Sequence, residues 1–252
     1  MKKVISSDVD QTLNVAKTPI TPEIATLLTR CLDYFEFCPI SGQKFDQFII
    51  QIVNPLLEAG ATPEQLKHLH LFVAQGTQYY HFDGHDWQEV YSYPLTDDQI
   101  GRISEALEIS AKELNLWPED EDDEIIENRL SQVTFSGLGQ HAGTEEKYAW
   151  DPDHSKRERI VERAKELAPD FEYQIAGTTS INAFVPGMDK EFGMNKLMEY
   201  LKVNKSDILY FGDMTQPGGN DYPVKHMGID TITVRSHEDT AFALRGLLGI
   251  LD

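Results

Sequence analysis

The sequence is poor in cations relative to acidic residues. Lysine and arginine together number 22 against 42 aspartates and glutamates, which gives a formal net charge of −20. A nucleic-acid-binding surface needs clustered cations to displace counterions, so this balance argues against a nucleic-acid partner. It does not argue against a small anionic substrate, because a few local cations or a metal ion can reverse the field inside a cleft.

Cysteine and long apolar runs are also scarce. The two cysteines, Cys31 and Cys38, have no histidine or further cysteine at the spacing of a metal site, so we expect two buried thiols in a reducing compartment. No apolar run approaches the roughly 20 residues of a membrane span. The apolar run in the N-terminal MKKVISSDVD is too short for a signal peptide. We therefore expect a cytoplasmic protein with no membrane contact.

The chain does contain enough apolar residues for a large core, since 40% of its 252 residues are hydrophobic. Strand and helix patterns alternate at both ends of the sequence. The strands are expected at 2–9, 37–41, 69–76, 207–213 and 230–234, and the helices at 21–35, 43–60, 194–203 and 237–251. This alternation predicts an α/β fold with a mostly parallel sheet and helices on both of its faces.

The middle of the chain has a different pattern. It contains an aromatic, hairpin-like stretch at 78–93, a long helix at 97–116 and strands at 129–138 and 180–185, and its acidic run at 118–126 is expected to be solvated. We interpret it as an α+β insert. The predicted domains are a core formed by residues 1–80 and 186–252 and an inserted cap at 81–185.

Four polar segments follow predicted core strands, at the sheet edge where open α/β sheets bind ligands. They are DVDQT with Asp8 and Asp10, ISGQ with Ser41 and Gly42, MDKEFGMNKL with Lys190, and YFGDMTQPGGNDY with Asp213 and Asp221. Each segment alone also fits an ordinary polar turn or a solvated lysine. Their occurrence together favours a reaction site.

These residue types predict phosphoryl transfer. The carboxylate of Asp8 can attack phosphorus, and Asp10, on the same side of an extended strand, can serve as general acid and base. Carboxylate oxygens suit Mg²⁺, which neutralises charge that would repel the phosphate. The hydroxyl of Ser41 and the amine of Lys190 can hold the phosphoryl oxygens.

In this order, the motifs resemble those of the haloacid dehalogenase (HAD) superfamily, subclass IIB, in which a large α+β cap (type C2b) follows the third core strand. The resemblance is closest to the eukaryotic-type phosphomannomutases, whose fourth motif reads much like FGDMTQPGGNDY. It implies a Rossmann-like core, Mg²⁺ as cofactor, a sugar phosphate as substrate and a homodimer formed through the cap.

The resemblance also implies a role for each motif residue. Asp8 would be the nucleophile and a metal ligand, and Asp10 the general acid/base, with its main-chain carbonyl on the metal. The third protein ligand would be Asp213, with Asn220 and Asp221 supporting the metal shell. Ser41, next to Gly42, and Lys190 would hold the transferring phosphoryl group.

The cap segment departs from the family in its cations. Arg129, Gln140 and Lys147 stand where the family has three arginines that bind the distal phosphate, and Lys17 stands in place of another arginine. Glutamine removes one cation, and lysine lacks the bidentate geometry of arginine. The distal phosphate is therefore expected to be held less firmly than in the family.

Two further departures concern the sugar and the first loop. Ser180 matches the segment that reads the sugar hydroxyls, whereas Asn182 replaces an aspartate there. Gln11 replaces the usual glycine after Asp10, and it is expected to narrow or re-aim the site.

Three functions remain open at this point. The first is interconversion of mannose 1-phosphate and mannose 6-phosphate through an aspartyl-phosphate. The second is hydrolysis of a sugar phosphate on the same scaffold, which Gln140 favours. The third, which only Gln11 favours, is a catalytically degenerate binding protein.

Overall fold

The computed structural model describes residues 2–15, 18–118, 124–139 and 141–251. The chain divides into two compact units. Unit 1 comprises Met1–Ser92, Asp189–Pro217 and Asp221–Asp252, and unit 2 comprises Tyr93–Met188 and Gly218–Asn220. Unit 1 carries the predicted core and unit 2 most of the predicted insert.

The parallel sheet of unit 1 has the strand order β11-β10-β1-β2. Its strands are β1 (Val4–Ser7), β2 (Glu36–Pro39), β10 (Ile208–Gly212) and β11 (Asp230–Thr233). Strand β3 (His70–Val73) lies beside β2 through two isolated parallel bridges, Phe37 to Leu69 and Ile40 to Phe72. All five predicted core strands are therefore present, and their carboxyl ends point to one edge.

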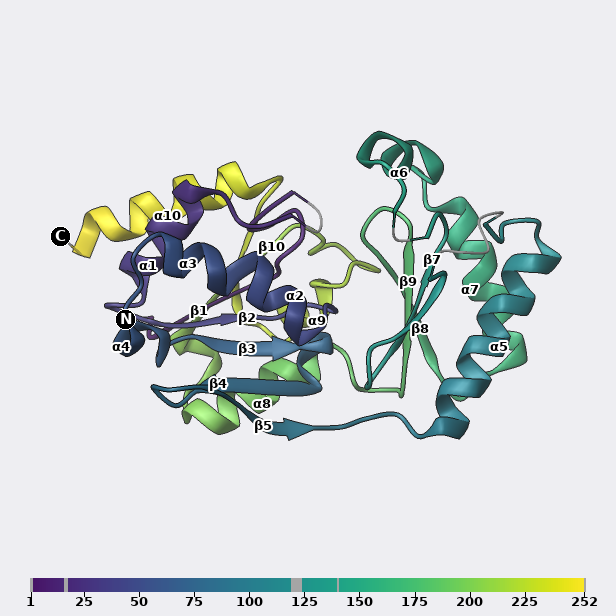
Figure 1. Ribbon diagram of the computed structural model, residues 1–252, viewed down its shortest axis with the longest axis horizontal. Coiled ribbons are helices and arrows are strands. Elements are labelled where there is room, and N and C mark those ends of the chain that lie inside the picture. Colours follow the sequence, from purple (N-terminus) through teal and green to yellow (C-terminus); the bar gives the residue numbers. More distant parts are fainter. Residues whose placement is uncertain (1, 16–17, 119–123, 140, 252) are drawn as a thin grey trace. The chain divides into compact units, whose positions relative to one another are not determined.

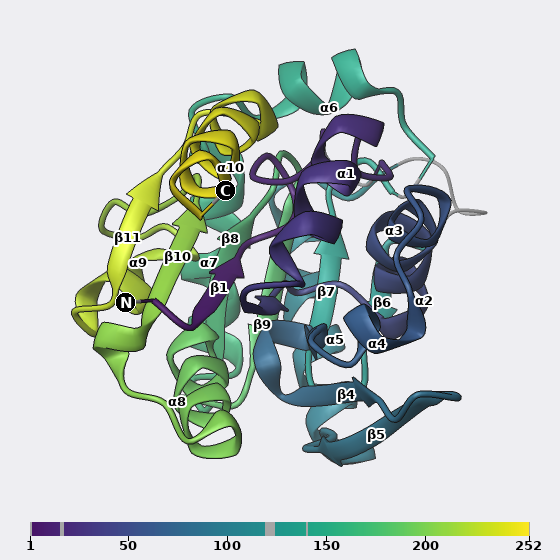
Figure 2. The same cartoon turned by 90° about the vertical axis from the view of Figure 1, so that its left-hand side faces the viewer.

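Helices cover both faces of this sheet, as Figures 1 and 2 show. One face packs on α1 (Pro22–Cys31), α10 (His237–Leu251) and a continuous helical stretch of α2 (Phe45–Phe48), a π-helical turn η1 (Ile49–Val53) and α3 (Asn54–Glu58). The other face packs on α8 (Lys190–Leu201) and α9 (Tyr222–His226). Short helical turns are α4 (Pro63–Leu66), η2 (Ala74–Gly76) and η3 (Lys205–Asp207). The α/β prediction is confirmed.

The aromatic hairpin differs from its predicted placement. Its strands β4 (Gln78–Phe82) and β5 (Trp87–Ser92) form an antiparallel sheet with β3, so the hairpin belongs to unit 1. The stacked rings of Phe72 and Tyr79, with centroids 4.7 Å apart, pack β4 against β3. The units therefore divide after Ser92 rather than after residue 80.

Unit 2 has an antiparallel sheet with the order β6-β7-β9-β8. The strands are β6 (Ile126–Asn128), β7 (Val133–Ser136), β8 (Glu172–Ala176) and β9 (Ser180–Phe184). Helices α5 (Asp97–Glu113) and α7 (Ser155–Leu167) share an apolar core with this sheet, and α6 (Thr144–Trp150) precedes α7. Because strand residues alternate between faces, the opposite face carries the polar cross-strand row Glu127, Thr134, Asn182 and Gln174.

None of the helices in the described ranges combines the length and the apolar character that a membrane-spanning segment requires.

Candidate active site

Three residues distant in sequence meet at the carboxyl edge of the parallel sheet. The Nζ atom of Lys190 lies 2.8 Å from Oδ1 of Asp8 and 2.6 Å from Oδ1 of Asp221. All three side chains are buried, and Lys190 is only 1% exposed. The hydroxyl of Tyr210 donates a hydrogen bond of 2.5 Å to the same Asp221 oxygen and accepts one of 3.3 Å from Lys190.

A third carboxylate completes this cluster. Ligand oxygens of Asp8, Asp213 and Asp221 all lie within 4.8 Å of one another. Three carboxylates around one ammonium leave an excess of negative charge. Their hard oxygens are the donors that a cation such as Mg²⁺ prefers, so the residues present fit a divalent metal ion.

Burial and mutual repulsion perturb these groups. The pKa of Asp8 is raised to about 8, chiefly by burial; Asp221 and Asp213 add to the rise, and Lys190 opposes it. Burial and Asp221 raise the pKa of Asp213 to about 6. Burial alone would lower the pKa of Lys190, but Asp221 and Asp8 outweigh it and hold the pKa above its ordinary value. The cluster therefore favours additional positive charge.

Local sequence explains how the carboxylates reach this place. Asp8 is the first residue after β1, and its amide donates to the carbonyl of Phe211 in β10. The loop from 213 to 221 closes on itself, since the amide of Met214 donates to Oδ2 of Asp221. A Cβ atom at Gly212 would lie 2.5 Å from that oxygen, so only glycine allows Asp221 to approach β10.

Lys190 is placed by the start of α8. Asp189 is the N-cap of this helix and accepts hydrogen bonds from the amides of Glu191 and Phe192. One turn on, a Cβ atom at Gly193 would lie 2.4 Å from Cδ1 of Ile40 and 2.7 Å from the carbonyl oxygen of Gln75. Glycine at 193 therefore lets the helix pack closely against the loops that follow β2 and β3.

The remaining core candidates lie in loops at the same edge. Ser41 is buried just after β2, followed by Gly42; the amide of Ser41 donates to Phe72, and its carbonyl accepts from Gln75. Asp10 is half-buried and forms an isolated bridge with Asn14. Its charge contributes to the raised pKa of Asp213, behind burial and Asp221.

Gln11 adopts a backbone conformation that glycine favours. Its φ angle is +64°, in the left-handed region. The loop thus keeps the conformation for which glycine is typical, with a half-buried glutamine in its place.

The other predicted substrate residues within the described ranges belong to unit 2. Arg129, at the end of β6, is 6% exposed and bonds Oε2 of Glu127 through both Nε, at 2.7 Å, and a terminal nitrogen, at 2.6 Å. Asn182 on β9 accepts a hydrogen bond of 2.9 Å from the hydroxyl of Thr134. Ser180 begins β9, and Lys147 lies on α6.

Lys17 and Gln140 lie outside the described residues. Sequence reasoning missed Tyr210 and Glu127, which hold Asp221 and Arg129. A tyrosine inside a buried strand directly before FGD was the available signal for Tyr210. For Glu127, the signal was an acidic residue two positions before Arg129.

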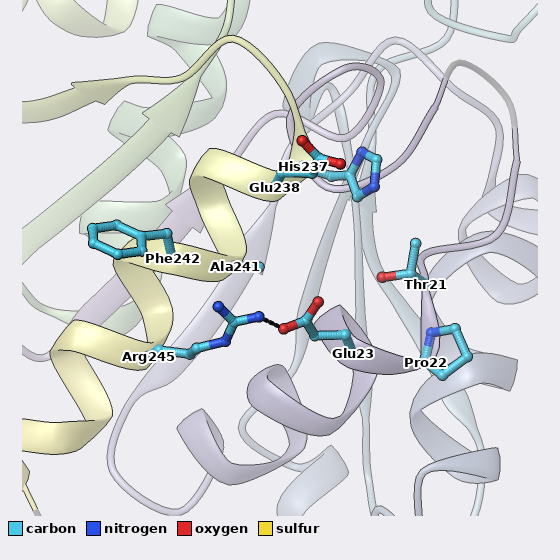
Figure 3. A pocket seen from close by; sticks show the side chains of 8 residues that line it. All are labelled: Thr21, Pro22, Glu23, His237, Glu238, Ala241, Phe242 and Arg245. Atoms are coloured by element: carbon cyan, nitrogen blue, oxygen red, sulfur yellow. Dashed lines mark ion pairs between the residues drawn. The ribbon is translucent and has the colours of Figure 1, made fainter.

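Unit 1 also has a shallow pocket of about 660 Å³ between α1 and α10, shown in Figure 3. It is lined by Thr21, Pro22, Glu23, His237, Glu238, Ala241, Phe242 and Arg245. Glu23 and Arg245 form an ion pair across it. None of the predicted site residues that the structure describes lines this pocket, so the chemistry is assigned to the carboxylate cluster.

Solved structures show the fold to which this geometry belongs. A haloacid dehalogenase-like hydrolase from Bacteroides thetaiotaomicron superposes with a TM-score of 0.65 at 15% identity, over 98% of this chain and all (100%) of that one. The IMP-nucleotidase of Plasmodium falciparum gives a TM-score of 0.71 at 15% identity, over 98% of this chain and 68% of that one. The fold is therefore HAD-like, as expected.

Sequence comparisons narrow the assignment. A probable phosphomannomutase of Caenorhabditis elegans is 25% identical over 263 aligned positions, covering 100% of this chain and 97% of that protein. The phosphomannomutase of Saccharomyces cerevisiae is 32% identical over 133 positions, about half of either chain (50% and 51%). The family model described as eukaryotic phosphomannomutase matches residues 109–250, which include Lys190, Asp213 and Asp221. The chain thus belongs to the eukaryotic phosphomannomutase family within the HAD superfamily.

Proposed function

We propose that this protein transfers a phosphoryl group on a hexose phosphate through an aspartyl-phosphate at Asp8, in the manner of a phosphomannomutase. The observation that carries the proposal is the buried cluster of Asp8, Lys190 and Asp221, with Asp213 completing a set of carboxylate oxygens within 4.8 Å. The family to which the chain belongs supports the same reaction.

Each of the core residues would have a separate role in the proposed reaction. A carboxylate oxygen of Asp8 attacks phosphorus, while Lys190, fixed by Asp221 and Tyr210, holds the phosphoryl oxygens beside it. Asp10 donates a proton to the leaving hydroxyl and takes one from the entering hydroxyl. Ser41, held through its own backbone amide and carbonyl, binds another phosphoryl oxygen.

We propose Mg²⁺ as the cofactor, with Asp8, Asp213 and Asp221 as side-chain ligands and the Asp10 carbonyl as a further one. When bound, the ion would supply the positive charge that keeps Asp8 ionised and screens it from the phosphate. The raised pKa values of Asp8 and Asp213 support this proposal, because burial and the neighbouring carboxylates oppose their ionisation and a bound cation would favour it.

Recognition of the sugar phosphate is proposed for unit 2. Ser180 and Asn182 would bind hydroxyl groups, and Arg129 and Lys147 the distal phosphate. Lys17, of unit 1, and Gln140 lie outside the described residues, and they are proposed for phosphate binding on sequence grounds alone. Asn182 already accepts a hydrogen bond from Thr134, so its amide is fixed to donate to a sugar oxygen.

The test is incubation with mannose 1-phosphate, Mg²⁺ and a trace of hexose 1,6-bisphosphate. Mannose 6-phosphate is the expected product, and Asp8→Asn is expected to abolish its formation. Inorganic phosphate as the sole product would overturn the isomerase assignment, and unchanged turnover in Asp8→Asn would overturn the aspartyl-phosphate.

A sugar-phosphate phosphatase is the second candidate, because the charge of Arg129 is neutralised by the buried carboxylate of Glu127. A weakly held distal phosphate would let the sugar monophosphate leave before it accepts the phosphoryl group from Asp8, so that water would hydrolyse the aspartyl-phosphate instead. Phosphate release across a panel of hexose and pentose phosphates, measured without bisphosphate, separates this activity from isomerisation.

We also propose a cytoplasmic location, which the two buried free thiols of Cys31 and Cys38 support. The homodimer through the cap stays a proposal, tested by light scattering of the purified chain.

A further inference from the structure

A buried ion pair in unit 2 has no part in the phosphoryl chemistry. The Nε atom of Arg157 donates to Oδ2 of Asp151 at 2.7 Å, and the two side chains are only 1% and 0% exposed. Burial opposes ionisation of Asp151, but hydrogen bonds from Arg157 and from the Lys156 and Arg157 amides outweigh it and lower its pKa. The pair is therefore ionised inside the protein.

The guanidinium of Arg157 also holds a turn. One terminal nitrogen donates to the carbonyls of Ala176, at 3.2 Å, and Gly177, at 2.9 Å. These residues end β8 and begin the turn at 177–179 that leads into β9. Since Ala176 pairs with Ser180 across the hairpin, Arg157 fixes the place where Ser180 enters the sheet.

Asp151 ties a second segment to the same point. It follows Trp150, the last residue of α6, and its Oδ1 accepts the amide of Lys156 at the start of α7. Lys156 in turn donates through Nζ to the carbonyl of Trp150. The ion pair thus sets where α6 ends and hence where Lys147, one turn earlier, lies.

A third segment packs against these two. The amide of Gly137, just after β7, donates to the carbonyl of Thr179 at 2.9 Å. A Cβ atom at Gly137 would lie between 2.1 and 2.7 Å from three ring carbons of Trp150. The indole therefore packs directly against the backbone of Gly137. The exit of β7, the end of α6 and the β8–β9 turn therefore form one block joined at Asp151 and Arg157.

Stability alone does not explain such a pair. Replacing a buried ion pair with apolar side chains of similar volume is often neutral or stabilising, because desolvation offsets the Coulomb attraction. A guanidinium that also binds two carbonyls of a turn adds geometric precision that an apolar contact does not supply.

We propose that Asp151 and Arg157 are positioning residues for substrate recognition. The pair sets the relative places of Ser180 and Lys147 within unit 2, and thereby the fit of the sugar part of the substrate. This inference rests on the proposed function, in which Ser180 and Lys147 contact the sugar phosphate.

The test compares Arg157→Lys with Arg163→Lys. The first change keeps the charge beside Asp151 but loses the fork that reaches the turn carbonyls. The second replaces a half-buried arginine of the same helix that pairs with Glu113 and Glu166. Both variants are assayed with the preferred sugar phosphate and with p-nitrophenyl phosphate. The aryl group of p-nitrophenyl phosphate has no hydroxyl groups that unit 2 could bind.

Arg157→Lys is expected to raise KM for the sugar phosphate about tenfold. This rise corresponds to about 1.4 kcal/mol, the size of one lost hydrogen-bonding contact. Its kcat/KM for p-nitrophenyl phosphate, and both activities of Arg163→Lys, should stay within about twofold of the parent. An unchanged sugar-phosphate KM, or an equal loss on both substrates, would overturn the positioning role.

A second variant keeps the test decisive if Arg157→Lys does not fold. Gly177 has a φ of +51°, and a Cβ atom added to it would meet no other atom within 4 Å, so Gly177→Ala strains the turn without a steric clash. It should show the same selective rise in sugar-phosphate KM, and a parent-like KM would refute the proposal. Wild-type protein that turns over no sugar phosphate refutes the proposed function instead, which these variants do not address.

Discussion

Replacement of Gln11 tests whether its loop stores conformational strain. The residue has a φ of +64°, where a Cβ atom crowds the following carbonyl oxygen. Gln11→Gly removes that Cβ, but it also removes a side chain that has interactions of its own. The informative comparison is therefore between Gln11→Gly and Gln11→Ala, because both lack the glutamine side chain and only alanine retains the Cβ.

The magnitude follows from two opposing effects. The left-handed conformation costs a residue with a Cβ roughly 1–2 kcal/mol, which glycine recovers. Glycine loses roughly 0.4–1 kcal/mol through the greater freedom of its unfolded chain. Gln11→Gly should thus be more stable than Gln11→Ala by about 0.5–1 kcal/mol, or about 1–4 °C in melting temperature for a chain of this size.

Urea unfolding of the two variants, followed by circular dichroism, measures this difference. Lys202 provides a matched control, since it has a φ of +54° at the exposed C-cap of α8, and Lys202→Gly should exceed Lys202→Ala similarly. If Gln11→Gly is no more stable than Gln11→Ala while the Lys202 pair behaves as expected, the strain at Gln11 does not exist. Measuring the turnover of both variants then separates the effect of the Cβ atom from that of the rest of the glutamine side chain. A change in turnover that both variants share is due to the loss of the glutamine side chain.

Two further predictions concern buried charge. Lys190→Met leaves the two carboxylates that it pairs with unneutralised, so the free energy of unfolding should fall by roughly 3–5 kcal/mol, whereas Lys196→Met on the same helix should change it by no more than about 0.5 kcal/mol. Equal effects in urea titrations would contradict the assigned role. The pKa of His70 lies below its ordinary 6.5 because burial outweighs its hydrogen bond to Glu36, so its contribution to stability is complete above pH 6.5 and is lost as the pH falls below that value. His70→Gln, compared with the parent at about pH 7.5 and pH 5.5, should show a smaller loss of stability on acidification; an identical loss would refute this explanation.

The sequence allowed prediction of the core because two local signals coincide there. Buried strands such as β1 and β10 appear as short apolar runs, and the polar residues that follow them must gather at one edge of a parallel sheet. Asp8, Asp213 and Asp221 could therefore be expected together from the sequence alone. A helix was likewise expected at 194–203, with Lys190 at its entry. The helix begins at Lys190 because Asp189 caps it, which the apolar pattern does not show.

Pairing partners and buried charges were harder to predict. The strands of the β4–β5 hairpin are visible in the sequence, but nothing local says that they pair with β3 rather than with the insert. Helix α7 has the sequence SKRERIVERAKEL, in which charge obscures the few apolar positions. Within it, Arg157 is fully buried whereas Arg163 is half-buried, and the contact of Arg157 with Asp151 contributes to this difference. That contact depends on the turn between α6 and α7.

The division of labour between the units follows from where the charges are. In unit 1, an ammonium and three carboxylates set up the attack on phosphorus, and this chemistry is the same whether a sugar hydroxyl or water later accepts the phosphoryl group. The acceptor must be chosen by the residues that hold the far end of the substrate. Under the proposed function, Arg129 of unit 2 would bind the distal phosphate. Because Arg129 is paired with Glu127, an incoming phosphate would have to compete with a buried carboxylate for the same guanidinium. Glu127→Gln would keep the shape of the pair and remove the competing charge. It should therefore tighten binding of hexose bisphosphate, measured by calorimetry, and raise the ratio of isomerisation to phosphate release; weaker binding would instead show that Glu127 orients Arg129 for the phosphate.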